Sequence, residues 1–282
     1  MDRLRSPAIK EGIVRRGRRL GPHHIQRGMT VAETIDELSK ADEAFAGSRL
    51  LATFSKEARA LIEPFGTVED VAPGDTVLRR GDQVETSIFP IGSTMISLSV
   101  ELTGGRSIEV ASIGREGAVG GIVSCGHAPA FSRASVLVGG RVLRVPMSAL
   151  EDAKNRSPFI ANLFCRFSDY LLSQVMQSVA CNAYHSIPQR AARWLLHAQD
   201  RAGDRIALTQ EAFAGLLGVQ RTTVNAVVQE LQQQGLVSTG RGVIRVTDRA
   251  GLKQRACECY SRLEEHFGAV IGSSGSGGST GC

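Results

Sequence analysis

The stretch from residue 158 to residue 184 contains no glycine and no proline after its first residue. Its apolar side chains recur mostly at a spacing of four, which is the period of an amphipathic helix. At 1.5 Å per residue such a helix is about 40 Å long, and a lone helix of that length needs a surface to pack on. The stripe contains Phe159, Leu163, Phe167, Leu171, Val175 and Val179, and it is widened by Phe164, Tyr170, Leu172 and Met176.

Two surfaces are available to cover this helix. One is a globular region of the same chain, and the other is the same helix of a second copy. Twofold pairs are the commonest oligomers, and apolar residues flank the stripe as well as fill it. We therefore predict a homodimer that pairs through this helix.

Residues 68–145 follow a different pattern, rich in Val, Ile, Ser and Thr and punctuated by glycines. Short β-rich runs separated by regular turn signals predict an antiparallel sandwich or a barrel-like roll. Before this region, the apolar spacing of residues 48–64 predicts one helix. The runs expected to be strands are 76–78, 94–102, 107–113, 135–138 and 141–145.

Residues 208–237 have the pattern of two short helices joined by a tight turn. Thr209 suits a helix N-cap, and Glu211 suits the positive end of the helix dipole. Gly218 follows the first apolar face directly, where a residue with positive φ would end that helix. Four apolar residues of the second helix are expected to point toward the interior. This arrangement is a helix-turn-helix. The inward residues are Val224, Val227, Val228 and Leu231.

The outward residues at the start of the second helix have the chemistry to read DNA. Arginine can pair with guanine, asparagine with adenine, and a threonine methyl can touch the thymine methyl. The N-terminal turn of such a helix has the size to enter the major groove. The residues predicted to bind DNA here are Thr209, Gln220, Arg221, Thr222, Thr223 and Asn225.

Residues 235–246 predict a β-hairpin with a Gly-Arg-Gly tip, which would form a wing beside the helix pair. Arg241 and Arg245 of this hairpin can reach DNA phosphates. Residues 186–250 contain eight arginines and five acidic residues, a net charge of +3. This charge favours a polyanionic partner. The alternative is a ligand-sensing or protein-interaction module that uses the helix pair only for packing.

The order of β-roll, long helix and winged helix-turn-helix resembles the Crp/Fnr superfamily of bacterial transcription regulators. The resemblance covers residues 48–268 and is densest in LTQEAFAGLLGVQRTTVNAVVQELQQQGLV. Three further segments resemble a branch of this family whose members have no known effector. These segments are CNAYHSIPQRAARWLL, IGREGAVG and DRAGLKQRACECY. The resemblance implies a homodimer on a palindromic operator, with RNA polymerase as a further partner. It also implies that Arg221 reads guanine.

At two positions the recognition helix departs from the cyclic-AMP-binding members of the family. Thr222 stands where they have glutamate, and Ala226 stands where they have a second arginine. The operator should therefore differ from theirs.

Eight basic and two acidic residues in positions 1–28 indicate a flexible basic arm, which either adds non-specific DNA affinity or is inert.

The sequence as a whole predicts an α+β fold that is built of consecutive parts. A composition of 42% hydrophobic and 22% charged residues, with a net charge of +5, excludes a chain that is disordered throughout. The predicted parts are an arm at 1–47, a cyclic-nucleotide-binding-like β-roll at 48–150, a dimerisation helix at 151–185, a winged helix-turn-helix at 186–268 and a Gly/Ser-rich tail at 269–282.

A cyclic-nucleotide site would need a glutamate for the ribose and an arginine for the phosphate at fixed spacing. The candidate effector-binding residues are Arg115, Glu116, Arg133 and Ser135, and their spacing departs from the family's cassette. We therefore expect structural charges here and no cyclic AMP, and the effector stays unknown.

The six cysteines are expected to be reduced thiols without a cofactor or a metal, because no C-x-x-C pair occurs. On one helix, Cys257 and Cys259 would point about 200° apart, which is poor for one ion. His127 and His185 have no evident partner pattern. The other cysteines are Cys125, Cys165, Cys181 and Cys282.

Other function classes lack support in the sequence. No apolar run is long enough for a membrane span, and no secretory signal pattern follows the N-terminus, so we expect a cytoplasmic protein. The chain contains no P-loop, G-x-S-x-G or H-E-x-x-H motif, so we do not expect an enzyme.

Overall fold

The computed structural model describes residues 40–104, 106–122 and 128–271 of the 282-residue chain. Residues 1–39 of the predicted arm and residues 272–282 of the predicted tail lie outside these residues, as do Cys125, His127 and Cys282. Residues 40–47, which the predicted arm included, are helical instead, with Ala44 and Phe45 buried in the core. Residues 269–271, which the predicted tail included, continue the last helix and end in the buried Ile271. Among the described helices, none combines the length and the apolar character needed to cross a bilayer.

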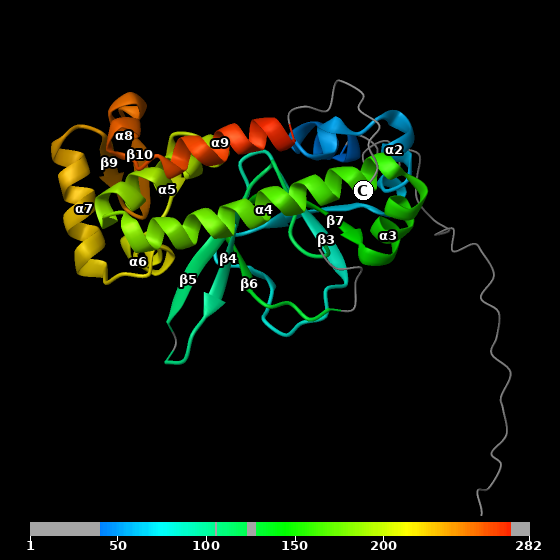
Figure 1. Cartoon of the computed structure of the whole chain (residues 1–282), viewed down its shortest axis with the longest axis horizontal. Helices are drawn as coiled ribbons and strands as arrows, with labels where there is room; N and C mark the ends of the chain where they lie inside the picture. The colour runs from blue at the N-terminus through cyan, green and yellow to red at the C-terminus, as the bar shows by residue number, and fades with distance from the viewer. Residues whose placement is uncertain (1–39, 105, 123–127, 272–282) are drawn as a thin grey trace, which may run out of the picture.

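The β-roll consists of two antiparallel sheets, which confirms the predicted fold class (Figure 1). One sheet has the order β1-β7-β3 and the other has the order β2-β6-β4-β5. The strands are β1 Thr67–Val71, β2 Thr76–Leu78, β3 Thr86–Ile91, β4 Met95–Glu101, β5 Ser107–Ile113, β6 Arg133–Val138 and β7 Gly140–Pro146.

The sequence patterns missed β1 and β3, and both are edge strands of the first sheet. Proline cannot donate a ladder hydrogen bond, so Pro90 fits inside β3 only because that strand lies at an edge. Strand β1 contains Glu69 and Asp70, residue types that are depleted in strands. The Glu69 carboxylate accepts a hydrogen bond from Arg144 of β7, which compensates for that preference.

The prediction of a single helix at residues 48–64 is wrong. The chain instead forms the 3-10 turns η1 Leu51–Thr53 and η2 Glu63–Phe65 around the short helix α2 Lys56–Ala60. Ser55 has extended backbone angles, and its side chain accepts a hydrogen bond from the Ala58 amide. It therefore starts a new helix rather than continuing an old one.

The predicted long helix is α4, Pro158–Tyr184, which follows α3, Met147–Arg156. Ser157 caps α4, because its side chain accepts from the Ile160 amide. One face of α4 packs on the β-roll, where Phe164 meets Phe89 of β3 edge to face with ring centroids 6.2 Å apart. The residues of α4 buried in this core are Ile160, Leu163, Phe164, Phe167 and Tyr170.

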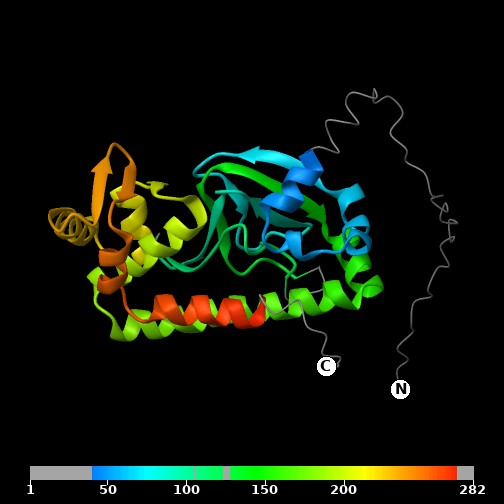
Figure 2. The ribbon, with the colours of Figure 1, turned by 90° about the horizontal axis from the view of Figure 1, so that it is seen from above.

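A helix that the sequence patterns did not single out runs alongside α4 (Figures 1 and 2). This helix is α9, Cys259–Val270. Its Phe267 ring lies 4.9 Å from that of Tyr170 on α4. The end of the described chain thus returns from the helix-turn-helix region to the core of the β-roll.

The C-terminal domain, which contains the predicted helix-turn-helix, has its own apolar core around Trp194, Phe213 and Leu231. A three-stranded sheet of order β8-β10-β9 forms one side of this domain. Its elements are α5 Ile187–Ala202, β8 Arg205–Ala207, α6 Gln210–Leu217, α7 Arg221–Gln233, β9 Val237–Gly240, β10 Val243–Val246 and α8 Arg249–Arg255.

The expectation that Cys257 and Cys259 share a helix is also wrong. Helix α8 ends at Arg255, and Ala256 is extended with φ −74° and ψ 153°. Helix α9 starts at Cys259. Cys257 therefore lies between the two helices, and the angular argument from helical spacing does not apply to it.

Candidate nucleic-acid interface

Helices α6 and α7 form the predicted helix-turn-helix. The Thr209 side chain accepts a hydrogen bond of 3.1 Å from the Ala212 amide, so Thr209 is the N-cap of α6. Gly218 ends α6 in the left-handed conformation with φ +67°. The turn lies against the β-roll, because a Cβ atom at this position would come within 2.9 Å of Ile108 of β5. Glycine is therefore required by conformation and by space.

The first turn of α7 presents polar side chains to solvent. Gln220 is its N-cap residue, and Gln220, Arg221, Thr222 and Thr223 are all exposed. The four valine and leucine residues predicted to point inward are buried in the domain core. Asn225 is half-buried, and its Oδ1 has no hydrogen-bond partner among the described residues. Its amide oxygen is thus both buried and unpaired, unlike the exposed polar groups of residues 220–223.

Arg221 faces Glu211 of α6 across the start of α7. Its Nε lies 3.9 Å from the Glu211 carboxylate, and both side chains are more than 60% exposed. An ion pair with this exposure contributes little to stability, so the guanidinium is free to exchange partners. Both residues line a surface cavity of about 490 Å³ together with Thr209 and the wing strands.

Strands β9 and β10 form the predicted wing. Its tip is Gly240-Arg241-Gly242, and Gly242 has φ +69°. Ile244 and Val246 point into the domain core, whereas Arg241 and Arg245 are exposed. Neither arginine has a carboxylate partner within the part of the chain that the structure describes.

Arg205 is a further exposed cation that the sequence analysis did not assign to the site. It lies on β8 directly opposite Arg245 of β10. Arg205, Arg241 and Arg245 line a second surface cavity of about 490 Å³ on the wing. Their alternation with buried Ile206 and Ile244 was visible in the sequence, but the pairing of β8 with β10 was not.

Several arginines that contributed to the net charge of +3 are engaged inside the molecule. Arg190 donates a 2.6 Å hydrogen bond to the Leu217 carbonyl, and Arg249 pairs with Asp200 at 2.7 Å. Arg201 is buried and pairs with Glu116. The cationic surface is therefore smaller than the sequence count implied, and it is concentrated on the wing and the start of α7.

The pair Glu116–Arg201 joins the β-roll to the C-terminal domain. Arg201 Nε donates to Glu116 Oε1 at 2.6 Å, and the Gly114 amide donates to the same carboxylate oxygen at 3.1 Å. Burial opposes the charge on Arg201, but the adjacent Glu116 carboxylate outweighs it and raises the pKa of the guanidinium. The two side chains therefore form an ion pair that is buried inside the junction.

A second polar contact crosses the same junction. Trp194 Nε1 donates a 2.7 Å hydrogen bond to Glu109 of β5. Burial raises the pKa of the Glu109 carboxyl, although the hydrogen bond from Trp194 favours its ionised form. Met95, Leu137 and Val138 of the β-roll pack into the apolar core of the C-terminal domain. The junction is thus both apolar and specifically hydrogen-bonded.

The four candidate effector residues have different surroundings. Glu116 is buried in the junction, while Arg133 donates to Thr76 at 2.9 Å and pairs with Glu101 on the surface. Arg115 is exposed, and Ser135 lies half-buried on β6. None of them lines the surface cavity of about 360 Å³ that lies beside β3 of the β-roll.

Comparison with known proteins places this geometry in a family. Residues 189–255 match the family described as the Crp-like helix-turn-helix domain. The chain is 28% identical over 191 residues to the HTH-type transcriptional regulator Cmr of Mycobacterium tuberculosis, covering 67% of this chain and 76% of Cmr.

Solved structures show the same fold. FixK2 from Bradyrhizobium japonicum matches with a TM-score of 0.60 at 17% identity, over 68% of this chain and 98% of FixK2. A Crp/Fnr-family regulator from Eubacterium rectale matches with a TM-score of 0.57 at 19% identity, over 74% and 98% of the two chains. Residues 189–255 are therefore a Crp-like helix-turn-helix domain, carried by a chain with the fold of the Crp/Fnr transcription regulators.

Proposed function

We propose that this protein is a sequence-specific DNA-binding transcription regulator that acts as a homodimer on a palindromic operator in the cytoplasm. The observation that carries the proposal is the exposed polar first turn of α7, flanked by wing arginines without carboxylate partners. Its effector is unknown, and a contact with RNA polymerase remains a prediction from the family.

We assign base recognition to the first turn of α7. Arg221 is held by only a weak surface contact with Glu211, so it can turn toward guanine O6 and N7 at small cost. Thr222 and Thr223 are exposed beside it and offer methyl and hydroxyl groups to base edges. Thr209 supports this turn from α6 as an N-cap that borders the same cavity.

Phosphate binding falls to the wing. Arg205 and Arg245 lie opposite each other on neighbouring strands, so their like charges repel in the free protein. A phosphate between them would relieve that repulsion and add a charge-assisted hydrogen bond to each. Arg241 at the tip extends the same surface.

We assign dimerisation to the solvent-exposed face of α4. The face opposite the β-roll core exposes Leu172, Met176 and Val179 at 50%, 61% and 66%. These residues recur at spacings of four and three, so they form one apolar stripe. A second copy related by a twofold axis would cover it and bring a second α7 to the same duplex, as a palindromic operator requires.

Operator affinity and salt dependence test the proposal together. We expect Arg221→Ala to cost about 1–3 kcal/mol on a selected operator and to relax specificity at one base pair. Arg241→Ala should weaken all duplexes alike and flatten the salt dependence. Arg156→Ala, which removes an exposed arginine of α3, is the control and should change neither.

Fluorescence anisotropy on operator and random duplex at two salt concentrations measures these effects. Equal losses on random DNA for Arg221→Ala and Arg241→Ala would reject the assignment of base reading to α7. No duplex binding at low ionic strength would favour the alternative of a ligand-sensing or protein-interaction module.

The dimer has its own test. Met176→Lys should convert a dimer into a monomer in sedimentation measurements, because it places a charge in the apolar stripe. Leu102→Lys changes an equally exposed leucine of the β-roll, 51% exposed, and should leave the dimer intact.

A further inference from the structure

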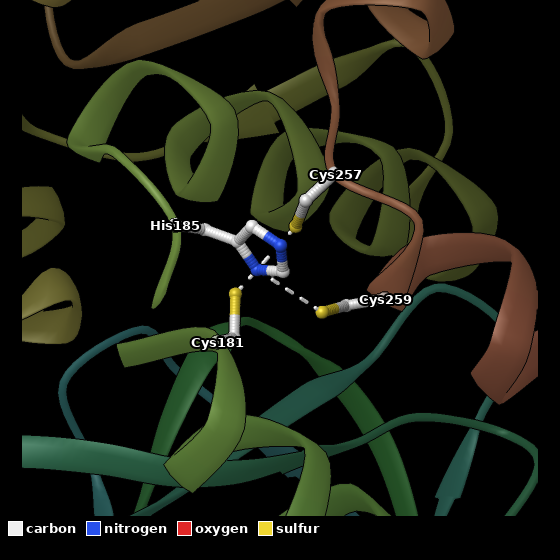
Figure 3. Close-up of side chains that lie close together, drawn as sticks. All are labelled: Cys181, His185, Cys257 and Cys259. Atoms are coloured by element: carbon white, nitrogen blue, oxygen red, sulfur yellow. Dashed lines mark hydrogen bonds between the residues drawn. The ribbon is translucent and has the colours of Figure 1, made fainter. Parts of the chain in front are cut away.

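Three cysteines and a histidine meet where α4 ends and α9 begins. Cys181 lies in the last turns of α4, and His185 is the C-cap residue of that helix. Cys257 lies between α8 and α9, and Cys259 is the first residue of α9. Figure 3 shows the four side chains pointing toward one another. Their three Sγ atoms and one imidazole nitrogen all lie within 4.8 Å of one another.

The separations have the size of a single-ion cage. A tetrahedral zinc ion with bonds of about 2.3 Å to sulfur and about 2.0 Å to nitrogen would hold two sulfurs about 3.8 Å apart and a sulfur about 3.5 Å from a nitrogen. The Sγ atoms of Cys181 and Cys257 lie 3.6 Å apart. The Sγ of Cys259 lies 3.4 Å from Nδ1 of His185.

The histidine is oriented as a ligand by a neighbouring carboxylate. Its Nδ1 faces the thiols, while its Nε2 lies 3.2 Å from the Glu258 carboxylate. Metal-binding histidines typically donate their other ring N–H to a carboxylate or a carbonyl, which fixes the ring and its tautomer. Gln177 of α4 adds a second outer contact, because its Nε2 donates to the Cys259 Sγ at 2.9 Å.

Burial separates this cluster from ordinary surface thiols. The three cysteines are 0%, 3% and 0% exposed and form an apolar cluster of their own. Three thiols and an imidazole fill all four positions of a tetrahedral ion, which is the ligand set of a closed structural site. Soft thiolates with imidazole select zinc over magnesium or calcium, which prefer oxygen ligands.

We propose that Cys181, His185, Cys257 and Cys259 bind one zinc ion as a structural site. Binding would replace the thiol protons of the three cysteines by bonds to the metal and release those protons to solvent. No oxidant or reductant is needed. The proposed zinc site does not rest on the proposed DNA binding, because none of its residues lies on α7 or the wing.

The position of the site gives it a mechanical role. Cys181 and Cys257 are 76 positions apart in the sequence, and the DNA-binding domain lies between them. The ion would therefore join both ends of that domain to one point, where the long helix ends and α9 begins. Such a cross-link fixes the angle at which the domain leaves α4.

Metal analysis of the full chain, purified under reducing conditions without chelator from zinc-supplemented cells, tests the proposal. Mass-spectrometric elemental analysis should find one zinc per chain. Cys181→Ser and Cys257→Ser should each lose most of it. Cys165→Ser changes an exposed cysteine of α4 outside the cluster and should keep it. Glu258→Gln should retain zinc but weaken its affinity by about 10–100-fold in a chelator competition.

The unmodified chain provides a measurement that does not depend on the folding of the variants. Cobalt exchanged into the site should give sulfur-to-metal charge-transfer bands and the intense visible bands of a tetrahedral ion. A zinc-free chain, iron in place of zinc, a Cys181–Cys257 disulfide in the purified protein, or a cobalt spectrum without thiolate bands would each overturn the proposal.

Discussion

Two groups of arginines in the DNA-binding domain have the same side chain and opposite surroundings. Arg205, Arg241 and Arg245 lie exposed on the wing without a carboxylate partner among the described residues. Arg190 and Arg201 are buried, where each donates to an oxygen of its own chain. The difference shows that the net charge of a segment does not reveal which of its cations are available to a ligand. The pairing of each cation inside the protein does reveal it.

The two groups should respond to mutation in different measurements. A buried charge that loses its partner destabilises the fold, whereas an exposed charge without a partner matters only when a ligand is present.

Removing the partner of a buried arginine should have the largest effect. Glu116→Ala leaves the Arg201 guanidinium buried without its carboxylate, and we expect a loss of about 3–5 kcal/mol in the free energy of unfolding. Urea denaturation measures it. Asp152→Ala removes the partner of exposed Arg156 and should cost at most about 1 kcal/mol. Similar losses for both variants would break the comparison.

The turn of the helix-turn-helix should be nearly as sensitive. Gly218→Ala puts a Cβ into a left-handed conformation and within 2.9 Å of Ile108, so we expect a loss of about 1–2 kcal/mol in stability. Gly215→Ala on α6 is the matched control, since its Cβ would meet nothing within 4 Å. That control should stabilise the helix by up to about 1 kcal/mol. A destabilised control would contradict this reasoning.

The junction should also be sensitive to acid. Burial lowers the pKa of His197, and Arg201, Arg193 and Arg249 lower it further. The folded state therefore keeps this imidazole neutral, while the unfolded chain takes up a proton below a pKa of about 6.5. The stability it contributes is complete above that pH and is lost as the pH falls, by at most about 1.4 kcal/mol per unit.

His197→Phe should therefore lose less stability than the unmodified protein between pH 7 and pH 5. Tyr260 and Glu264 of α9 also face this ring, so the comparison between the two proteins matters more than either curve. The exposed His266→Phe serves as the control for loss of an imidazole. A steeper acid loss in His197→Phe would refute the prediction.

The smallest effect is expected on the wing and only in the presence of DNA. Arg205→Ala and Arg245→Ala should leave the unfolding free energy within about 0.5 kcal/mol of the original. Each should reduce the slope of log affinity against log salt by about one, because one phosphate contact is lost. An unchanged slope for Arg205→Ala would remove β8 from the interface.

Local signals in the sequence were enough to predict much of the fold. The helix α4, the cap at Thr209 and the left-handed Gly218 each depend on neighbouring residues, and the structure confirms all three. Edge strands β1 and β3 were missed because Glu69, Asp70 and Pro90 oppose strand formation unless a partner strand is known.

The candidate site was harder to predict from the sequence, because its remaining parts depend on contacts between distant segments. Arg205 joins the wing only through the pairing of β8 with β10. Arg201 is not part of the cationic surface, because it is paired in the interior with Glu116, which lies 85 positions earlier in the sequence. Cys257 turns toward Cys181 only because α8 ends before it, and helical spacing could not anticipate that break.

Selection of bound duplexes from a random pool, performed in parallel with the unmodified protein and Arg221→Ala, tests the central claim most directly. We expect the unmodified protein to enrich a palindrome with half-sites one helical turn apart, and we expect Arg221→Ala to lose the preference for one base pair in each half-site. Enrichment of no sequence, or an identical palindrome from both proteins, would contradict this claim.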